Sequence, residues 1–244
     1  MTTILRPFKE FVRSIVFRFI KPVVKIPNSY AQAGEDVVMN FLFQGIGIKH
    51  PSYLELGVHH PDDANNTYKF YMEGSRGVLV EANPSLIPKI REKRPEDVVL
   101  NFGVGVTNEK AAQFFVFDEP GISTFDQKEA DLRSDSGAHK LVTILSVEIK
   151  SITDILEENF KRRPDLLSID IEGLDLAVLE SLDTKKHPIP VICVETCVYS
   201  ENHIRPKDHR IGDYMASIGY FPYADTYINT IYVNKDWFYS LEEK

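Results

Sequence analysis

The sequence predicts an α/β fold built on a doubly wound, mostly parallel sheet, and three observations support this prediction. Short apolar segments of the kind that form buried strands recur along the chain, and segments with helical spacing separate them. Several apolar segments end in an acidic residue or a glycine, which is typical of strands that run into loops at the carboxyl edge of a parallel sheet. A chain of 244 residues is long enough for one such domain with a large core.

Composition and charge exclude several classes of protein. The chain is 43% hydrophobic and 26% charged, and its net charge of −8 argues against nucleic acid as the main partner. Cys193 and Cys197 lie in one apolar segment, which predicts buried, reduced thiols of a cytoplasmic protein rather than disulfides or a zinc site. No apolar segment approaches the roughly 20 residues that a membrane-spanning helix needs.

We divide the chain into an N-terminal extension, residues 1–28, and a main domain, residues 29–244. Apolar residues recur at helical spacing over residues 4–20, and the first 27 residues hold six basic residues and one acidic residue. Such a basic amphipathic helix lies on an anionic membrane surface or docks on protein, either on this chain or on a second copy in a homo-oligomer. A helix with such an apolar stripe more often docks on protein than lies on a membrane. The segment also lacks the cleavage site of a signal peptide. We therefore expect a cytoplasmic protein, with peripheral membrane contact through residues 1–27 as the alternative.

The first half of the main domain alternates between predicted strands and helices. Glu35 and Asp36 suit the start of an apolar helix, where carboxylates meet the positive end of the helix dipole. Three strands are predicted next, at residues 53–58, 77–81 and 98–106. Two helices lie between them, over residues 68–74 and from Pro84 to about residue 93. This alternation implies parallel strands joined by right-handed crossovers.

The second half combines further strands with a charged segment. Residues 126–140 contain glycine and serine and show no clean period, so we expect a mobile loop or lid there. Ser151 or Thr153 is expected to cap a helix that precedes the fourth core strand. The remaining predicted strands are residues 111–118, 141–149, 166–173 and 190–197, with a final antiparallel pair at 220–227 and 229–233. The remaining predicted helices are residues 174–182 and 206–218.

The ends of the first two strands predict a site for a ligand that contains a ribose. Glu81 ends the second strand 24 residues after Gly57, and an acid at that point typically binds both hydroxyls of a ribose. The three-glycine loop that cradles a pyrophosphate is missing, because His59, His60 and Pro61 fill the turn. A ligand with a ribose but no phosphates fits better, and S-adenosylmethionine (SAM) is such a ligand.

We assign candidate SAM contacts along these strand ends. Glu81 is expected to bind the ribose hydroxyls, Ala82 and Asn83 to lie beside the adenosine, and Val104 to line the adenine pocket. Gly57 would let the backbone approach the methionine part of SAM. Weaker candidates for the amino and carboxylate groups of SAM are Gln32, Glu55, Asn66 and Thr67. The alternative for residues 65–67 is a helix cap.

Three carboxylates are expected to meet at the opposite side of the same edge. Asp170 and Glu172 are two residues apart at the end of one strand, and Glu195 ends its predicted neighbour. Carboxylates this close either raise the pKa of one of them, which makes a general base, or bind Mg²⁺ or Mn²⁺. Helix capping and a surface salt bridge are the alternative for the first two. His203 could add a ligand or base, although His203 and His139 are more simply solvated histidines.

Several segments of the sequence resemble motifs of the FkbM-type SAM-dependent methyltransferases. The matching segments are residues 32–36, 55–57, 60–61, 65–67, 77–84, 151–154, 168–175, 178–179 and 191–196. Glu55 departs from the family pattern, where an aspartate is common, and the glycine-rich loop is reduced to Gly57. The resemblance covers roughly residues 29–235.

The resemblance implies a seven-stranded, Rossmann-like class I methyltransferase fold with an antiparallel C-terminal strand. It further implies methyl transfer from SAM, usually to a hydroxyl, with a sugar, a glycan of polysaccharide biosynthesis or a polyketide-type natural product as the acceptor. Asp170, Glu172 and Glu195 would then be the catalytic groups on the acceptor side. Two alternatives stay open: a non-catalytic SAM-fold scaffold or membrane anchor, and an NAD-dependent oxidoreductase, which would need the absent three-glycine loop.

Overall fold

The structure is a computed structural model that describes residues 29–107, 109–197 and 206–241. The N-terminal helix predicted within residues 1–28 and the candidate His203 lie outside these residues. Within the described ranges, no helix combines the length and the apolar character needed to cross a bilayer.

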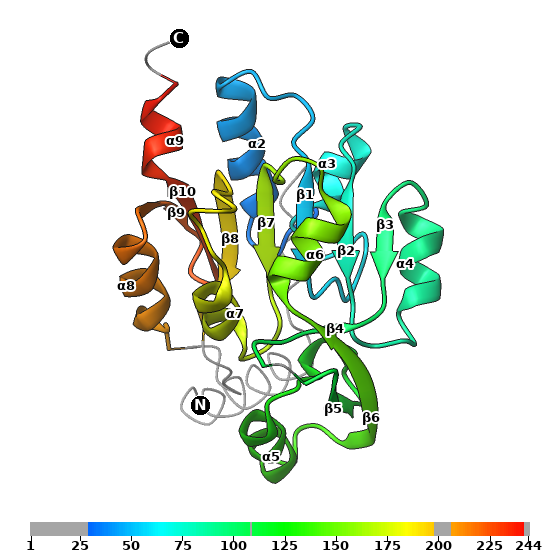
Figure 1. Cartoon of the computed structure of the whole chain (residues 1–244). Coiled ribbons are helices and arrows are strands. Elements are labelled where there is room, and N and C mark those ends of the chain that lie inside the picture. Colours follow the sequence, from blue (N-terminus) through cyan, green and yellow to red (C-terminus); the bar gives the residue numbers. More distant parts are fainter. Residues whose placement is uncertain (1–28, 108, 198–205, 242–244) are drawn as a thin grey trace, which may run out of the picture.

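A seven-stranded sheet forms the centre of the main domain, as predicted (Figure 1). Its strand order is β3-β2-β1-β7-β8-β10-β9, and every neighbouring pair is parallel except the two pairs that include β10. The predicted antiparallel pair at the C-terminus is therefore confirmed. The strands are β1 (Tyr53–Leu56), β2 (Gly77–Val80), β3 (Val98–Leu100), β7 (Leu166–Ile169), β8 (Val191–Glu195), β9 (Tyr220–Asp225) and β10 (Asn229–Asn234).

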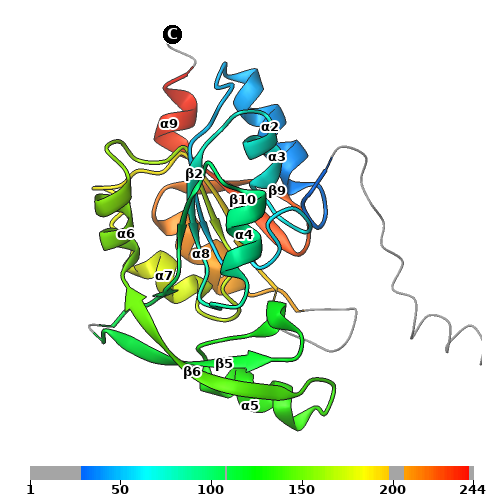
Figure 2. The same cartoon turned by 90° about the vertical axis from the view of Figure 1, so that its right-hand side faces the viewer.

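Helices cover both faces of this sheet, because the central strands are apolar on both faces (Figure 2). Alternate residues of β1 point into two separate cores: Leu54 and Leu56 into one, and Tyr53 into the other. The first core packs against α6 (Ile152–Asn159), α7 (Asp175–Ser181) and α8 (His209–Ser217). The second packs against α2 (Glu35–Gly45), α3 (Tyr68–Met72), α4 (Ile87–Lys93) and α9 (Lys235–Tyr239).

A second, three-stranded sheet lies beyond the carboxyl ends of the parallel strands of the main sheet (Figure 1). We call residues 103–150, which contain it, the insert. Its order is β4-β6-β5, and a short 3₁₀ helix and α5 follow β5. The elements are β4 (Gly103–Val104), β5 (Ala111–Phe117), η1 (Pro120–Ile122), α5 (Gln127–Asp135) and β6 (Leu141–Lys150).

The structure of the insert differs from two of the predictions. The single strand predicted at residues 98–106 is wrong: it is divided into β3 and β4, which belong to different sheets. The mobile loop predicted at residues 126–140 is also wrong, because residues 127–135 form α5, and the Asp126 carboxylate caps it by accepting hydrogen bonds from two backbone N–H groups. This helix has no apolar stripe to reveal it, since Ala130 and Arg133 are its only buried residues.

Smaller differences concern element ends and one cysteine. The helix predicted from residue 206 begins at His209, because the Asp208 side chain caps its N-terminus. Ser151 caps α6, as one of the two predicted candidates. The sequence did not predict α9. Cys193 is buried as expected, whereas Cys197 is partly exposed, because β8 ends at Glu195 and Cys197 lies in the segment that follows.

Candidate active site

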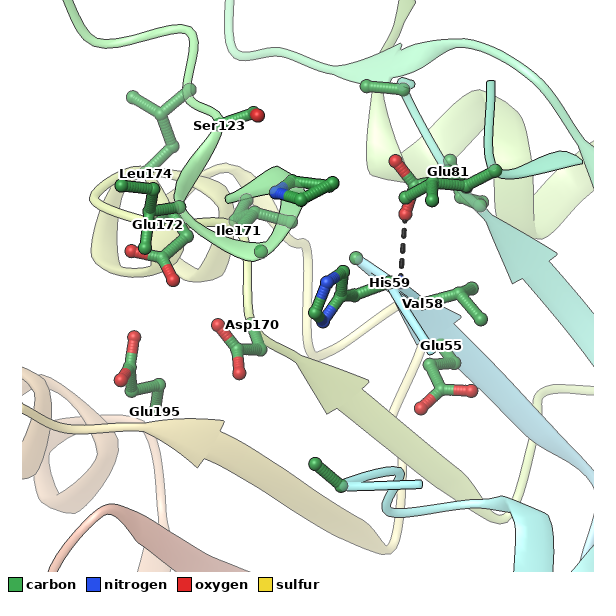
Figure 3. Close-up of a pocket in the computed structure, with 18 of the residues that line it drawn as sticks. Glu55, Val58, His59, Glu81, Ser123, Asp170, Ile171, Glu172, Leu174 and Glu195 are labelled. Carbon is green, nitrogen blue, oxygen red and sulfur yellow. Dashed lines mark hydrogen bonds between the residues drawn. The ribbon is translucent and has the colours of Figure 1, made fainter. Parts of the chain in front are cut away.

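A cavity of about 580 Å³ lies at the carboxyl ends of β1, β2, β7 and β8. The insert closes its other side through residues 119–123 and 138–139. Figure 3 shows the acidic side chains that the strand ends contribute, with Glu81 at one end and Glu172 and Glu195 at the other. The volume is within the usual range for a small-molecule or cofactor site.

Gly57 follows β1 and lines the cavity where the chain passes close to the end of β7. Its φ is +82°, and an added Cβ would lie 1.8 Å from the carbonyl oxygen of Asp170. Its N–H donates to Val80, while the N–H of Asp170 donates to Leu56. Only glycine permits this contact, so Gly57 is needed for the close approach of β1 and β7 as well as for the cavity that it lines.

Glu81 points into the cavity from the end of β2 and is only 6% exposed. One carboxylate oxygen accepts a hydrogen bond from the N–H of Asn83, and the other accepts one from the N–H of His59 (Figure 3). Burial raises the pKa of Glu81, and these backbone N–H groups oppose that rise. A carboxylate oxygen can accept a second hydrogen bond, so both oxygens can still bind ligand hydroxyls.

His59 occupies the turn between β1 and the cavity and was not among the predicted site residues. Its backbone is left-handed, with φ of 49°, which is uncommon outside glycine and asparagine. Its half-buried ring packs against Gly121 of the insert, and its Nε2 lies 3.7 Å from a carboxylate oxygen of Glu119. Burial and then the neighbouring His60 lower the pKa of His59 to about 4, so the ring is neutral at neutral pH.

Glu55 lines the cavity but is already bound by protein groups. Its oxygens accept hydrogen bonds from Asn65 and Thr67, at 2.9 and 2.7 Å. Arg94, which is fully buried, lies 3.7 Å from Glu55 and 2.7 Å from Asp97. Burial is the largest influence on the pKa of Glu55 and raises it, while Arg94 lowers it. Nothing in the local sequence indicated Arg94, since it ends a short surface helix.

The cavity brings together most of the predicted SAM contacts. Thr67 and Asn83 do not line it. Thr67 donates to Glu55, and the side-chain oxygen of Asn83 accepts hydrogen bonds from the N–H and hydroxyl of Ser85. Of the alternative roles at residues 65–67, Asn65 orders the start of α3, because its side-chain oxygen accepts from the N–H groups of Thr67 and Tyr68. The predicted contacts that line the cavity are Gln32, Glu55, Gly57, Asn66, Glu81, Ala82 and Val104.

Asp170, Glu172 and Glu195 converge at the other end of the cavity, with one oxygen of each within 4.8 Å of the others. We predicted this convergence because Asp170 and Glu172 would share one face of a strand. However, β7 ends at Ile169, so neither residue belongs to that strand. Glu172 instead reaches this position through a left-handed turn, with φ of 55°. The Asp175 carboxylate holds that turn by accepting from the N–H groups of residues 171 and 173.

Two further groups border the carboxylates. Arg133 of α5 donates to Glu172 with a distance of 2.8 Å, a contact that no pattern in the sequence indicated. His139 lines the cavity, with its Nδ1 3.7 Å from Asp118. The oxygen set matches the ligand preference of a divalent cation, although Arg133 already engages one oxygen of Glu172. The same set can also act as a general base.

Comparison with known proteins identifies the family. A family model described as the methyltransferase FkbM domain matches residues 55–222, which is more than half of the chain. The match includes Gly57, Glu81 and all three converging carboxylates. No curated protein matches the chain.

Solved structures of similar proteins share little sequence with this chain. An O-methyltransferase from Bacillus cereus in complex with SAH is 13% identical, with a TM-score of 0.42 over 93% of this chain and 89% of that one. A TehB-like SAM-dependent methyltransferase from Corynebacterium glutamicum is 8% identical, with a TM-score of 0.40 over 94% and 97%. A 1,6-didemethyltoxoflavin-N1-methyltransferase from Burkholderia thailandensis is 11% identical, with a TM-score of 0.38 over 93% and 88%.

The fold assignment rests on the chain's own strand order rather than on these three structures, and the family match supplies the activity. The chain belongs to the FkbM methyltransferase family and is a SAM-dependent methyltransferase.

Proposed function

We propose that the protein transfers the methyl group of SAM to a hydroxyl of a sugar, a glycan or a related natural product. The observation that carries this proposal is the arrangement of one cavity. Glu81 lies at one end, and Asp170, Glu172 and Glu195 meet at the other. A ribose-binding acid and a set of proton-accepting or cation-binding groups are what O-methylation of a weakly acidic hydroxyl requires.

The donor end of the cavity offers both hydrogen-bonding groups and apolar side chains that suit SAM. Glu81 would accept hydrogen bonds from the two ribose hydroxyls, and Ala82, Phe102 and Val104 would flank the adenine. Gln32 and Asn66 would bind the amino and carboxylate groups of SAM. Bound SAM supplies an electrophilic methyl group on a sulfonium. The chain's own residues would hold donor and acceptor close together and in line, which is a proximity effect.

The acceptor end must activate a hydroxyl, because a protonated hydroxyl is a poor nucleophile. Asp170 lies between the Glu172–Glu195 pair and the Glu81 end of the cavity (Figure 3). Asp170 would therefore be the carboxylate nearest to the reacting methyl group, and it would accept the hydroxyl proton. The alternative is a Mg²⁺ or Mn²⁺ ion held by the three carboxylates.

The cavity disfavours the NAD-dependent alternative. Six acidic side chains line it, and no lysine or arginine does so among the described residues. A dinucleotide pyrophosphate would face repulsion from these carboxylates. The lining is compatible with an uncharged acceptor hydroxyl and with the cationic sulfonium of SAM.

Replacing Glu81 with glutamine or alanine should weaken SAM binding by about 10–100-fold, because hydrogen bonds to a charged group contribute about 1.5–3 kcal/mol. Glutamine keeps the volume and one acceptor oxygen, so its effect should be the smaller. Calorimetric titration with SAM measures the change. Glu92→Gln, an exposed acid on α4, is the matched control. Unchanged affinity in Glu81→Ala would exclude this donor site.

Turnover tests the function itself. SAH formation would be measured with glucose, galactose, rhamnose and N-acetylglucosamine, each as the free sugar and as a nucleotide sugar. Transfer to a hydroxyl supports the proposal, and binding of SAM without transfer to any of them counts against a sugar acceptor. Loss of the rate in EDTA and its return with Mn²⁺ would identify the carboxylates as a metal site. A rate unaffected by EDTA would favour Asp170 as the base.

A further inference from the structure

Arg133 and Ala130 are the two buried residues of α5, and Arg133 carries a positive charge. Its side chain is 1% exposed, and its guanidinium donates to the carbonyl of Ile122 and to the carboxylate of Glu172. A carboxylate oxygen of Glu129 lies 3.5 Å away on the same helix. Burying a guanidinium is costly unless its donors are paired. These contacts therefore fix the orientation of Arg133 and connect α5 to the loop that follows β7.

The insert also fixes the backbone of Glu172. The residue adopts a left-handed conformation that is unfavourable outside glycine, so the surrounding structure must hold it there. The hydroxyl of Thr124 in the insert donates to the Glu172 carbonyl at 2.8 Å. Asp175 fixes the same turn from α7. The insert thus contacts Glu172 at both its backbone and its carboxylate, through Thr124 and Arg133.

The direction in which the Glu172 carboxylate points depends on its ion pair with Arg133. One of its oxygens lies within 4.8 Å of oxygens of Asp170 and Glu195, where like charges repel. Glu172 is only partly buried, so its side chain has room to rotate away from the other two. The guanidinium at 2.8 Å offsets the repulsion and opposes that rotation.

We propose that Arg133 is a positioning residue of the methyl-transfer site, which holds the Glu172 carboxylate beside Asp170 and makes the insert part of the acceptor end. This inference rests on the proposed function, since it assigns Glu172 a role in transfer. Arg133 does not line the large cavity and acts through Glu172. Its loss should therefore slow transfer without weakening SAM binding at the Glu81 end.

Arg133→Met should lower kcat by about 100-fold, the effect of a small misplacement of a catalytic group, while the Kd for SAM stays unchanged. Arg133→Lys should recover part of the rate, because lysine keeps the charge but not the planar pair of donors. Lys128→Met removes an exposed cation from the same helix and should keep the wild-type rate. The assay uses the full chain and the sugar with the highest turnover in the panel above. If Arg133→Met does not fold, the kcat of Arg133→Lys and its Kd for SAM test the proposal instead.

A double-mutant cycle separates positioning from a general structural effect. In a Glu172→Gln background, Arg133→Met should cause little further loss of kcat, because the group it positions is already altered. The same fold-loss in both backgrounds, or a wild-type kcat in Arg133→Met, would overturn the inference. A wild-type protein that binds SAM but methylates no sugar would instead overturn the proposed function. In that case, urea unfolding of the same four proteins still measures the Arg133–Glu172 coupling, and additive stabilities would overturn the positioning contact.

Discussion

Asp170→Asn should lower kcat by about 10²–10⁴-fold, which is the usual contribution of a general base. Asparagine keeps the shape of the side chain and leaves the backbone hydrogen bond from residue 170 to Leu56 in place. The amide cannot accept the acceptor proton, and it is a weaker ligand for a divalent cation. The loss is therefore expected whether the site works as a base or through a metal ion.

Steady-state kinetics and SAM titration together test this prediction. The Kd for SAM should change little, because Asp170 lies away from Glu81, where the ribose of SAM is proposed to bind. Glu180→Gln, an exposed acid on α7, is the control for loss of a carboxylate and should keep the wild-type rate. An Asp170→Asn enzyme with wild-type kcat would remove Asp170 from the mechanism.

Arg94→Met should reduce the free energy of unfolding by about 3–5 kcal/mol, since it removes one partner of a buried ion pair and leaves carboxylates uncompensated. Arg94 contacts Asp97 at 2.7 Å, and its guanidinium donates to the hydroxyls of Tyr53 and Thr67. Its loss should also affect Glu55 and the cavity wall. Urea unfolding measures the change, and Arg91→Met, at an exposed position of the same helix, should alter stability by no more than about 0.5 kcal/mol.

The pH dependence of this variant provides a second test. Burial already places the pKa of Glu55 above its usual value, and loss of Arg94 should raise it further. The folded state then binds more protons than the unfolded state, so stability falls as the pH rises from the unfolded pKa of Glu55 toward its folded pKa. The deficit of Arg94→Met relative to the wild type should therefore grow as the pH rises above the folded-state pKa of Glu55 in the wild type, which is itself raised. A deficit that is constant with pH would show that Glu55 remains compensated.

The sequence predicted the central sheet and most of its strand ends correctly because these features depend on local pattern. Strands such as β1 and β7 are buried on both faces, so they are continuous apolar segments. Residues at the carboxyl ends of adjacent parallel strands are brought to one edge by topology alone. Glu81, Asp170 and Glu195 could therefore be assigned to one site without a structure.

The insert could not be predicted in this way. α5 shows no apolar stripe, and the segment at 98–106 looks like one strand although its two halves pair with different partners. Pairing partners depend on contacts between distant segments, such as β4 with β6. Local periodicity contains no information on such contacts.

The sequence by itself determined the class of fold and the meeting of Glu81, Asp170 and Glu195 at one edge of the main sheet. Only the tertiary structure decided which groups surround them. Arg94 reaches Glu55 across 39 residues, and Arg133 reaches Glu172 across another 39. Such pairs form because a buried charge must find a partner wherever the fold brings one close, and that proximity depends on three-dimensional packing rather than on spacing along the chain.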